Sequence, residues 1–200
     1  MARGVDPLAF RLDLLRGPDE IETGDVKIDR RRLRRVLEVV RDKSNWSRPF
    51  VFPGRGRGVA CSVYDGDTYI AYVVESTVAT GGHVKVDRVV AAVDCGLVVN
   101  PIGVEQQLEG GVIWSLSSAL KGQITFKQGA AEQSSYSDFA VARVTDSPVI
   151  ETHIIERADE QPFGMGEPPV PSLAPALLNA LFQATGKRLR KLPVTPAQLL

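Results

Sequence analysis

Hydrophobic positions recur at helical spacing near both ends of the chain and once in the middle. The pattern predicts helices over residues 6–15, 29–43, 103–120 and 174–185. In the second of these, Leu33, Val36 and Val40 fall on one face of a helix. The first opens with Asp6 followed by Pro7, the favoured order of a capping side chain and then a proline in the first turn.

Runs rich in valine, isoleucine, tyrosine and threonine separate these helices. They predict strands over residues 59–64, 68–79, 84–93, 123–127 and 149–155, with a last short strand over 189–194. Turn-forming residues at 65–67 and 81–82 join the first three by short connections, which favours an antiparallel meander. We therefore predict an α+β fold, a mostly antiparallel sheet with packed helices. Residues 1–52 are predicted to be a helical N-terminal segment and linker, and residues 53–200 a domain.

Composition and charge exclude several classes of protein. The chain has 200 residues, 44% of them hydrophobic, with 24 basic and 24 acidic side chains. A formal net charge of zero produces no field that would gather nucleic acid or acidic membranes. No apolar run approaches the roughly 20 residues that span a bilayer. Residues 1–4 lack the apolar core of a signal peptide, so we expect no export signal, and the compartment stays open between bacterial cytoplasm and periplasm.

Two basic segments raise the question of phosphate or nucleic-acid binding. One face of the helix over 29–43 carries Arg30, Arg31, Arg34, Arg35 and Arg41. A nucleic-acid surface is one reading, but acidic residues elsewhere favour a solvated or subunit-facing surface. The Gly-Arg run over 54–58 lacks the Lys-Ser/Thr ending of a phosphate-binding loop. A strand follows this run, so a flexible lead-in to the sheet is the favoured interpretation.

Cysteine, histidine and serine offer little independent chemistry. Cys61 and Cys95 are too few and too far apart for an iron–sulfur or zinc site. We interpret Cys61 as a buried thiol and Cys95 as a packed residue, a place near a cofactor being the alternative. His83 and His153 lack metal-ligand spacing, and the serines over 134–137 have no nearby histidine for a hydrolytic triad.

One carboxylate, Glu167, stands between flexible glycines and rigid prolines in the sequence Phe-Gly-Met-Gly-Glu-Pro-Pro of residues 163–169. Glycine allows a backbone to approach another object closely, and proline stiffens the exit from the loop. This arrangement suits a general base directed at a large, preformed group. An ordinary surface turn that carries a glutamate is the alternative.

A second candidate is the adjacent pair Gly110 and Gly111 within the helix over 103–120. Each glycine costs a helix roughly 1 kcal/mol relative to alanine. The pair therefore indicates either tight packing against a neighbour or close contact with a bulky ligand. In the second case Gln106 or Gln107 would offer amide hydrogen bonds to that ligand.

Three motifs follow one another in a recognisable order. They are Asp94-Cys95-Gly96 through Asn100-Pro101, Gln107-Leu108-Glu109-Gly110-Gly111, and Gly166-Glu167-Pro168. Together they resemble the molybdopterin-binding subunits of molybdenum hydroxylases. The isoquinoline 1-oxidoreductase beta subunit and bacterial aldehyde-oxidising relatives are most similar, and xanthine dehydrogenase is more distant. Residues 5–11, 54–60 and 174–177 also resemble this subgroup.

The resemblance implies a fold like the C-terminal molybdopterin-binding domain of the xanthine dehydrogenase family, and specific roles for residues. Glu167 would be the general base, taking a proton from a metal-bound hydroxide that attacks an N-heteroaromatic ring or an aldehyde. Gln107 would hydrogen-bond the pterin, with Gly110, Gly111 and Gly166 also at the cofactor. A dry pocket would adapt the carboxylate to base catalysis.

The implied cofactor is molybdopterin with molybdenum, in the cytosine dinucleotide form. No iron–sulfur cluster and no direct metal ligand are expected in this chain. The implied partners are the N-terminal part of the large subunit, a small two-iron–two-sulfur subunit and a small-molecule substrate.

The chain also departs from the family pattern. Family subunits are several times longer, and their earlier glycine-rich cofactor loops have no counterpart here. We therefore expect a C-terminal piece of such a subunit, inactive as a hydroxylase on its own. A non-catalytic remnant or interaction module that keeps the scaffold without the cofactor is the alternative. Phe163 and Met165 flank Glu167, but apolar contacts of this kind do not identify the substrate.

Overall fold

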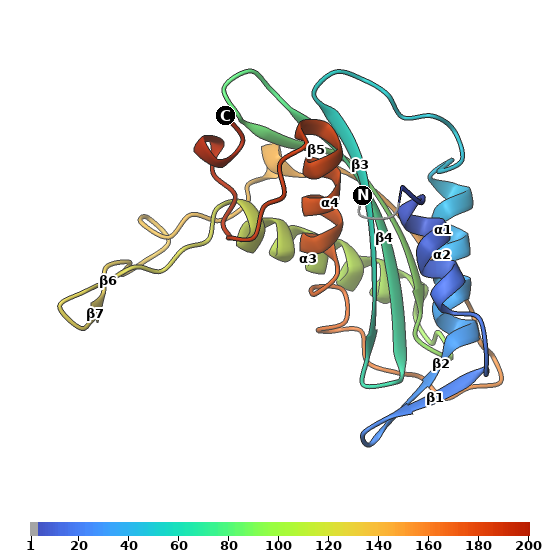
Figure 1. The fold of residues 1–200 in the computed structure, drawn as a ribbon. Helices are drawn as coiled ribbons and strands as arrows, with labels where there is room; N and C mark the ends of the chain where they lie inside the picture. The colour runs from blue at the N-terminus through green and yellow to red at the C-terminus, as the bar shows by residue number, and fades with distance from the viewer. Residues whose placement is uncertain (1–3) are drawn as a thin grey trace.

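A four-stranded sheet forms the centre of the molecule (Figure 1). The computed structural model describes residues 4–200. The strands lie in the order β3 (Arg55–Tyr64), β4 (Thr68–Val78), β5 (Val84–Asp94) and β8 (Val149–Ile154). The first three are antiparallel, and β8 pairs parallel to β5. The predicted meander and the α+β class are confirmed.

Helices cover both faces of this sheet. On one face lie α1 (Pro7–Leu14) and α2 (Arg30–Lys43), and on the other lie α3 (Pro101–Leu120) and α4 (Leu173–Thr185). Successive side chains of a strand point to opposite faces. Accordingly Tyr69 and Ala71 of β4 pack in the α1–α2 layer, whereas Ile70 and Tyr72 pack in the α3–α4 layer. The central strands are therefore apolar on both sides.

The first helix starts at the predicted capping residue, and two other helix ends have recognisable caps. Asp6 caps α1, accepting hydrogen bonds from the N–H groups of Leu8 and Ala9 at 3.0 and 2.8 Å. Asp29 caps α2 in the same way, and Gly186 ends α4 in a left-handed conformation with a φ of 74°. All four predicted helices are confirmed to within a few residues.

Residues 55–58 were predicted to be a flexible lead-in, and this prediction is wrong because they form the first part of β3. A Cβ at Gly56 would lie 1.9 Å from the carbonyl oxygen of Ala180, and one at Gly58 would lie 2.1 Å from that of Ala176. These glycines let the backbone of α4 contact the strand directly. Their function is packing, whereas a run of alternating glycine and arginine is also typical of a flexible loop.

Other expectations also change. The hairpin of β1 (Glu20–Thr23) and β2 (Val26–Asp29) was not predicted, since four-residue, largely exposed strands leave little hydrophobic pattern. The strand expected over 189–194 is absent from the described structure. Instead the Val194 N–H donates to the Ala119 carbonyl at 2.8 Å, and a short turn of helix, η2 (Pro196–Gln198), follows.

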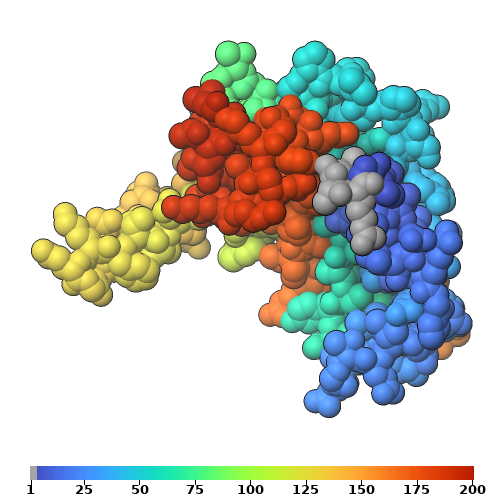
Figure 2. All heavy atoms as spheres, in the orientation of Figure 1, coloured from blue at the N-terminus to red at the C-terminus, as the bar shows by residue number. Residues whose placement is uncertain are grey.

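The segment between α3 and β8 extends away from the body of the molecule (Figures 1 and 2). It contains the small hairpin of β6 (Phe126–Lys127) and β7 (Ala130–Ala131) and the helical turn η1 (Val144–Asp146). The predicted strand over 123–127 is reduced to its last two residues. The side chain of Phe126 is 74% exposed.

Four further sequence expectations concern membrane spans, an export signal, the cysteines and the division of the chain. No helix in the described residues is long and apolar enough to cross a membrane. The expectation of no export signal rests partly on residues 1–3, which lie outside the described residues. Cys61 is half-buried against the α1–α2 layer, and Cys95 is buried in the other layer. The division between residues 1–52 and 53–200 stays a prediction.

Candidate functional site

Segments far apart in the sequence meet around a cleft of about 660 Å³, here called the Glu167 cleft. Its lining comes from the end of β3, from α3, and from the loop before α4. The residues are Tyr64, Gln107, Gly110, Gly111, Trp114, Gly166, Glu167, Val170 and Pro171. All five residues predicted to act at the site are therefore brought together. Their individual roles stay predictions.

Glu167 has one hydrogen-bond partner that the sequence did not reveal. The Tyr64 hydroxyl donates to Oε2 of Glu167. This hydrogen bond, with smaller contributions from burial and the nearby carboxylate charges, raises the pKa of Tyr64. Glu167 itself is exposed, so the described residues alone do not provide the dry surroundings expected for the base. The only signal for Tyr64 was its place at the end of a strand.

The backbone on either side of Glu167 is held by side chains of β4. The Thr68 hydroxyl donates to the carbonyl of Gly164 at 3.0 Å. The Tyr72 hydroxyl, which is buried, donates to the carbonyl of Pro169 at 2.8 Å. A loop fixed at both ends to the central sheet presents its carboxylate from a defined position.

The Asp94-Cys95-Gly96 motif holds the approach to the same loop. The N–H of Phe163 donates to the Cys95 carbonyl at 2.9 Å, and the N–H of Leu97 donates to that of Gln161 at 3.2 Å. Gly96 has a φ of 73°, and a Cβ there would lie 2.1 Å from the Gln161 oxygen. Only glycine fits this position. The motif therefore helps to place Glu167 without reaching the cleft.

A buried ion pair lies under this turn. Arg32 donates to Asp94 through two nitrogens, at 2.6 and 3.0 Å, and to the Asp67 carbonyl at 2.8 Å. Its guanidinium lies 4.3 Å from the ring centre of Tyr69 and 5.5 Å from that of Phe163. Sequence reasoning missed Arg32 because it stands among arginines that face outward.

The cleft fits a bulky group with polar edges. A Cβ at Gly110 or Gly166 would meet no atom within 4 Å, so both glycines open onto free space. A Cβ at Gly111 would lie 2.4 Å from Cβ of Pro169, so this glycine serves tight packing. The exposed amide of Gln107 makes no hydrogen bond within the described chain and is available to a ligand.

Protein ligands for a metal are not grouped anywhere in residues 4–200. No cluster of three histidine, cysteine, aspartate or glutamate side chains is arranged to hold an ion there. A metal carried on an organic ligand of its own would not need such a cluster. The open glycines and the free amide of Gln107 suit that kind of ligand.

Comparison with known proteins decides the family. The model of the molybdopterin cofactor-binding domain matches residues 41–148. The chain belongs to this family. It is 32% identical to one of the subunits of nicotinate dehydrogenase from Pseudomonas putida, over 97% of this chain and 17% of that protein. It is 33% identical to the beta subunit of isoquinoline 1-oxidoreductase from Brevundimonas diminuta, over 81% of this chain and 21% of that one.

Solved structures agree with the fold. The aldehyde oxidoreductase from Desulfovibrio desulfuricans superimposes with a TM-score of 0.58 at 27% identity, over 66% of this chain and 15% of that chain. The quinoline 2-oxidoreductase from Pseudomonas putida has a TM-score of 0.60 over 96% of this chain and 27% of that one, at 18% identity. The predicted relationship to molybdenum hydroxylase subunits and to their fold is confirmed. The chain spans 17 to 26% of the length of the first curated relatives.

Proposed function

We propose that the chain forms the C-terminal part of the cofactor-binding subunit of a molybdenum oxidoreductase. The reaction would be hydroxylation of an N-heteroaromatic compound or an aldehyde, with oxygen derived from water. Relatives named for nicotinate, isoquinoline and aldehyde support this range of substrates. The family itself supports the molybdopterin cofactor.

The observation that carries this proposal is the convergence at the Glu167 cleft. Gln107 and Gly110 come from α3, whereas Gly166 and Glu167 come from the loop before α4. The two segments meet where a carboxylate, a free amide and two open glycines surround the same space. A purely structural turn at residues 163–169 would not need these neighbours.

Each residue has a defined task in this proposal. When bound, molybdopterin with molybdenum, in its cytosine dinucleotide form, supplies the oxidising centre that accepts two electrons. Gln107 binds the pterin edge through its amide, and Gly110 and Gly166 leave room for it. Tyr64 occupies Oε2 of Glu167, so Oε1 is the oxygen that accepts the proton.

The rest of the enzyme would come from other segments. The remainder of a large subunit would close the exposed side of the cleft and exclude water around Glu167. A small two-iron–two-sulfur subunit would carry the electrons away. In this proposal the cluster belongs to that subunit, since the two cysteines of this chain, Cys61 and Cys95, lie in different layers of the fold.

A non-catalytic remnant or interaction module is the second candidate. Trp114 is 68% exposed and Glu167 is also exposed, so the described residues enclose neither side chain. This exposure favours the second candidate. The two proposals differ in whether the cleft takes up cofactor when the companion polypeptides are present.

Co-expression with the companion polypeptides tests the proposal. We expect molybdenum to be near one per assembled enzyme, with turnover of an N-heteroaromatic or aldehyde substrate, and no turnover by the isolated chain. A Gly110→Leu variant should fold but lose molybdenum, because its side chain enters open space in the cleft. Ser118→Leu, at an exposed position of α3 outside the cleft, is the matched control. An assembled complex without molybdenum would support the remnant instead.

A further inference from the structure

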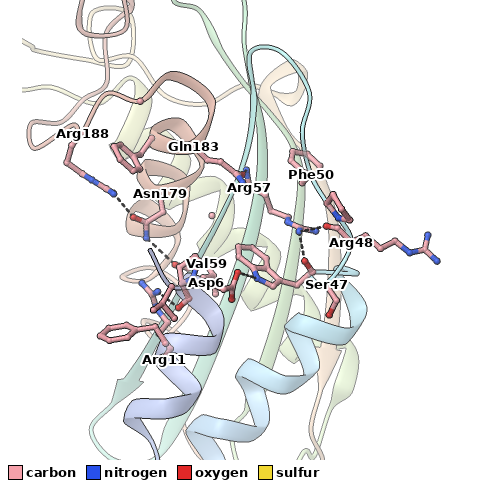
Figure 3. A pocket seen from close by; sticks show the side chains of 18 residues that line it. Asp6, Arg11, Ser47, Arg48, Phe50, Arg57, Val59, Asn179, Gln183 and Arg188 are labelled. Carbon is pink, nitrogen blue, oxygen red and sulfur yellow. Dashed lines mark hydrogen bonds between the residues drawn. The ribbon is translucent and has the colours of Figure 1, made fainter. Parts of the chain in front are cut away.

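A second cavity of about 820 Å³ lies between α1, the segment over 46–50, β3 and α4 (Figure 3). It shares no lining residue with the Glu167 cleft. We call it the arginine pocket, because Arg11, Arg57 and Arg188 line it beside Trp46, Phe50 and Phe182. Arg48 also borders it, but its side chain extends away from the others in Figure 3.

The side chains of the three arginines are bound through neutral oxygens. Within residues 4–200 none of them forms an ion pair with a carboxylate, whereas Arg32 and Arg88, for example, do. Arg11 donates to the Pro7 carbonyl at 2.8 Å, and Arg188 donates to the Asn179 amide oxygen at 2.9 Å. The guanidinium of Arg57 donates only to backbone carbonyls, those of residues 44, 45, 46 and 48.

Among the residues described, Asp6 is the one acid that lines the pocket, and its oxygens already accept hydrogen bonds. Asp6 caps α1 through Oδ1 and accepts a hydrogen bond from the indole Nε1 of Trp46 at Oδ2, at 2.9 Å. Its oxygens are therefore directed to groups other than the guanidinium groups. The pocket is left with an excess of positive charge that a bound anion would balance.

Donors and charge come from different arginines. Arg57 is 8% exposed, its Nη atoms are used and its Nε is buried, so it contributes charge rather than hydrogen bonds. Burial lowers the pKa of Arg57, and the charges of Glu75 and Asp6 offset only part of that effect. Arg11 and Arg188 each use one Nη atom and keep further N–H groups for a ligand.

The walls indicate a flat, apolar body. The guanidinium of Arg57 lies 4.4 Å from the Trp46 ring centre and 5.2 Å from that of Phe50, and Arg188 lies 3.6 Å from that of Phe182. Rings held rigidly by such contacts offer flat surfaces for stacking. The volume is within the range of small-molecule sites, about 300–1,000 Å³.

We propose that the arginine pocket binds a small aromatic carboxylate. The carboxylate lies between Arg11 and Arg188, since the planar guanidinium matches its two oxygens. The ring lies against Trp46 and Phe182. This site is separate from the proposed function of the Glu167 cleft, and either can hold without the other.

The two tryptophans of the chain report on the two cavities independently, because Trp46 lines the arginine pocket and Trp114 lines the Glu167 cleft. In a titration of the ¹⁵N-labelled chain with 2-naphthoate, we expect the Trp46 indole signal to shift and saturate while that of Trp114 stays in place. Arg188→Gln and Arg11→Gln should each weaken binding about tenfold. Arg190→Gln, exposed and outside the pocket, should leave it unchanged.

Other outcomes would overturn the proposal. An unmoved Trp46 signal at millimolar 2-naphthoate would do so, as would an affinity of the Arg11→Gln and Arg188→Gln variants equal to that of the unchanged chain. If 2-naphthalenemethanol bound as tightly as 2-naphthoate, the pocket would not require an anion. If inorganic phosphate bound as tightly as 2-naphthoate, the pocket would not require an aromatic ring. Tighter binding of an acidic peptide than of 2-naphthoate would assign the pocket to a protein partner instead.

Discussion

Replacing Asp94 by asparagine should destabilise the protein far more than the loss of an ordinary charge. The Arg32 and Asp94 side chains are 7% and 1% exposed, so the variant leaves a buried guanidinium without its counter-charge. Breaking a buried pair in this way costs about 3–5 kcal/mol. The asparagine amide can still accept one hydrogen bond, which places the expected loss near the lower end of that range.

Asp42→Asn is the matched control on the same helix as Arg32. Its pair with Arg41 is 61% and 37% exposed, and such surface pairs contribute about 0–1 kcal/mol. Urea unfolding followed by tryptophan fluorescence measures both variants. With an m-value of about 2 kcal/mol per molar urea, Asp94→Asn should lower the midpoint by about 1.5 M.

Two further measurements test the role of the buried pair of Arg32 and Asp94. The double variant Arg32→Met/Asp94→Leu should be more stable than Asp94→Asn, because it removes both charges together. Hydrogen exchange at the Phe163 N–H should accelerate in Asp94→Asn, since that N–H is bonded to the turn above the pair. If Asp94→Asn shifted the midpoint no more than Asp42→Asn, the structural role assigned to the motif would be refuted.

In urea unfolding, Gly110→Ala should stabilise the chain by up to about 1 kcal/mol, because its Cβ enters open space. Gly111→Ala should destabilise the chain, because its Cβ meets Pro169. Equal effects of the two variants would contradict the distinction between an open and a packed glycine. Glu167→Gln should lower the pKa of Tyr64 toward its usual value, measured by NMR of ¹³C-labelled tyrosine, and an unchanged pKa would show that the hydrogen bond is absent. Because the pKa of Tyr64 is raised, its contribution to stability is present at neutral pH and is lost as the pH rises through that pKa. The Glu167→Gln variant should therefore lose less stability between neutral and alkaline pH than the unchanged chain.

Much of the fold could be predicted because its signals are local. Helical spacing and the capping signal of Asp6 followed by Pro7 define the helices, and turn residues define the meander. Residues 55–58 were misassigned because glycines that serve a helix–strand contact look like those of a flexible loop. The contact with α4 is tertiary, and no local pattern encodes it.

The candidate site was predictable only as an ordered set of motifs. The order of the Gln107, Gly110 and Glu167 motifs pointed to one family, and the fold then placed them at one cleft. Tyr64 and Arg32 could not be found this way. Each acts through a partner far along the chain, Glu167 and Asp94 respectively, and only the folded arrangement reveals the pairing.

The most direct test of the central claim is the turnover and molybdenum content of the assembled enzyme carrying Glu167→Gln. We predict molybdenum equal to that of the unchanged enzyme and a turnover lower by at least about 100-fold, because only proton acceptance at Glu167 is removed. Glu22→Gln, on the exposed β1–β2 hairpin, should change neither value. Turnover of the Glu167→Gln enzyme close to that of the unchanged enzyme would contradict the assignment of Glu167 as the base.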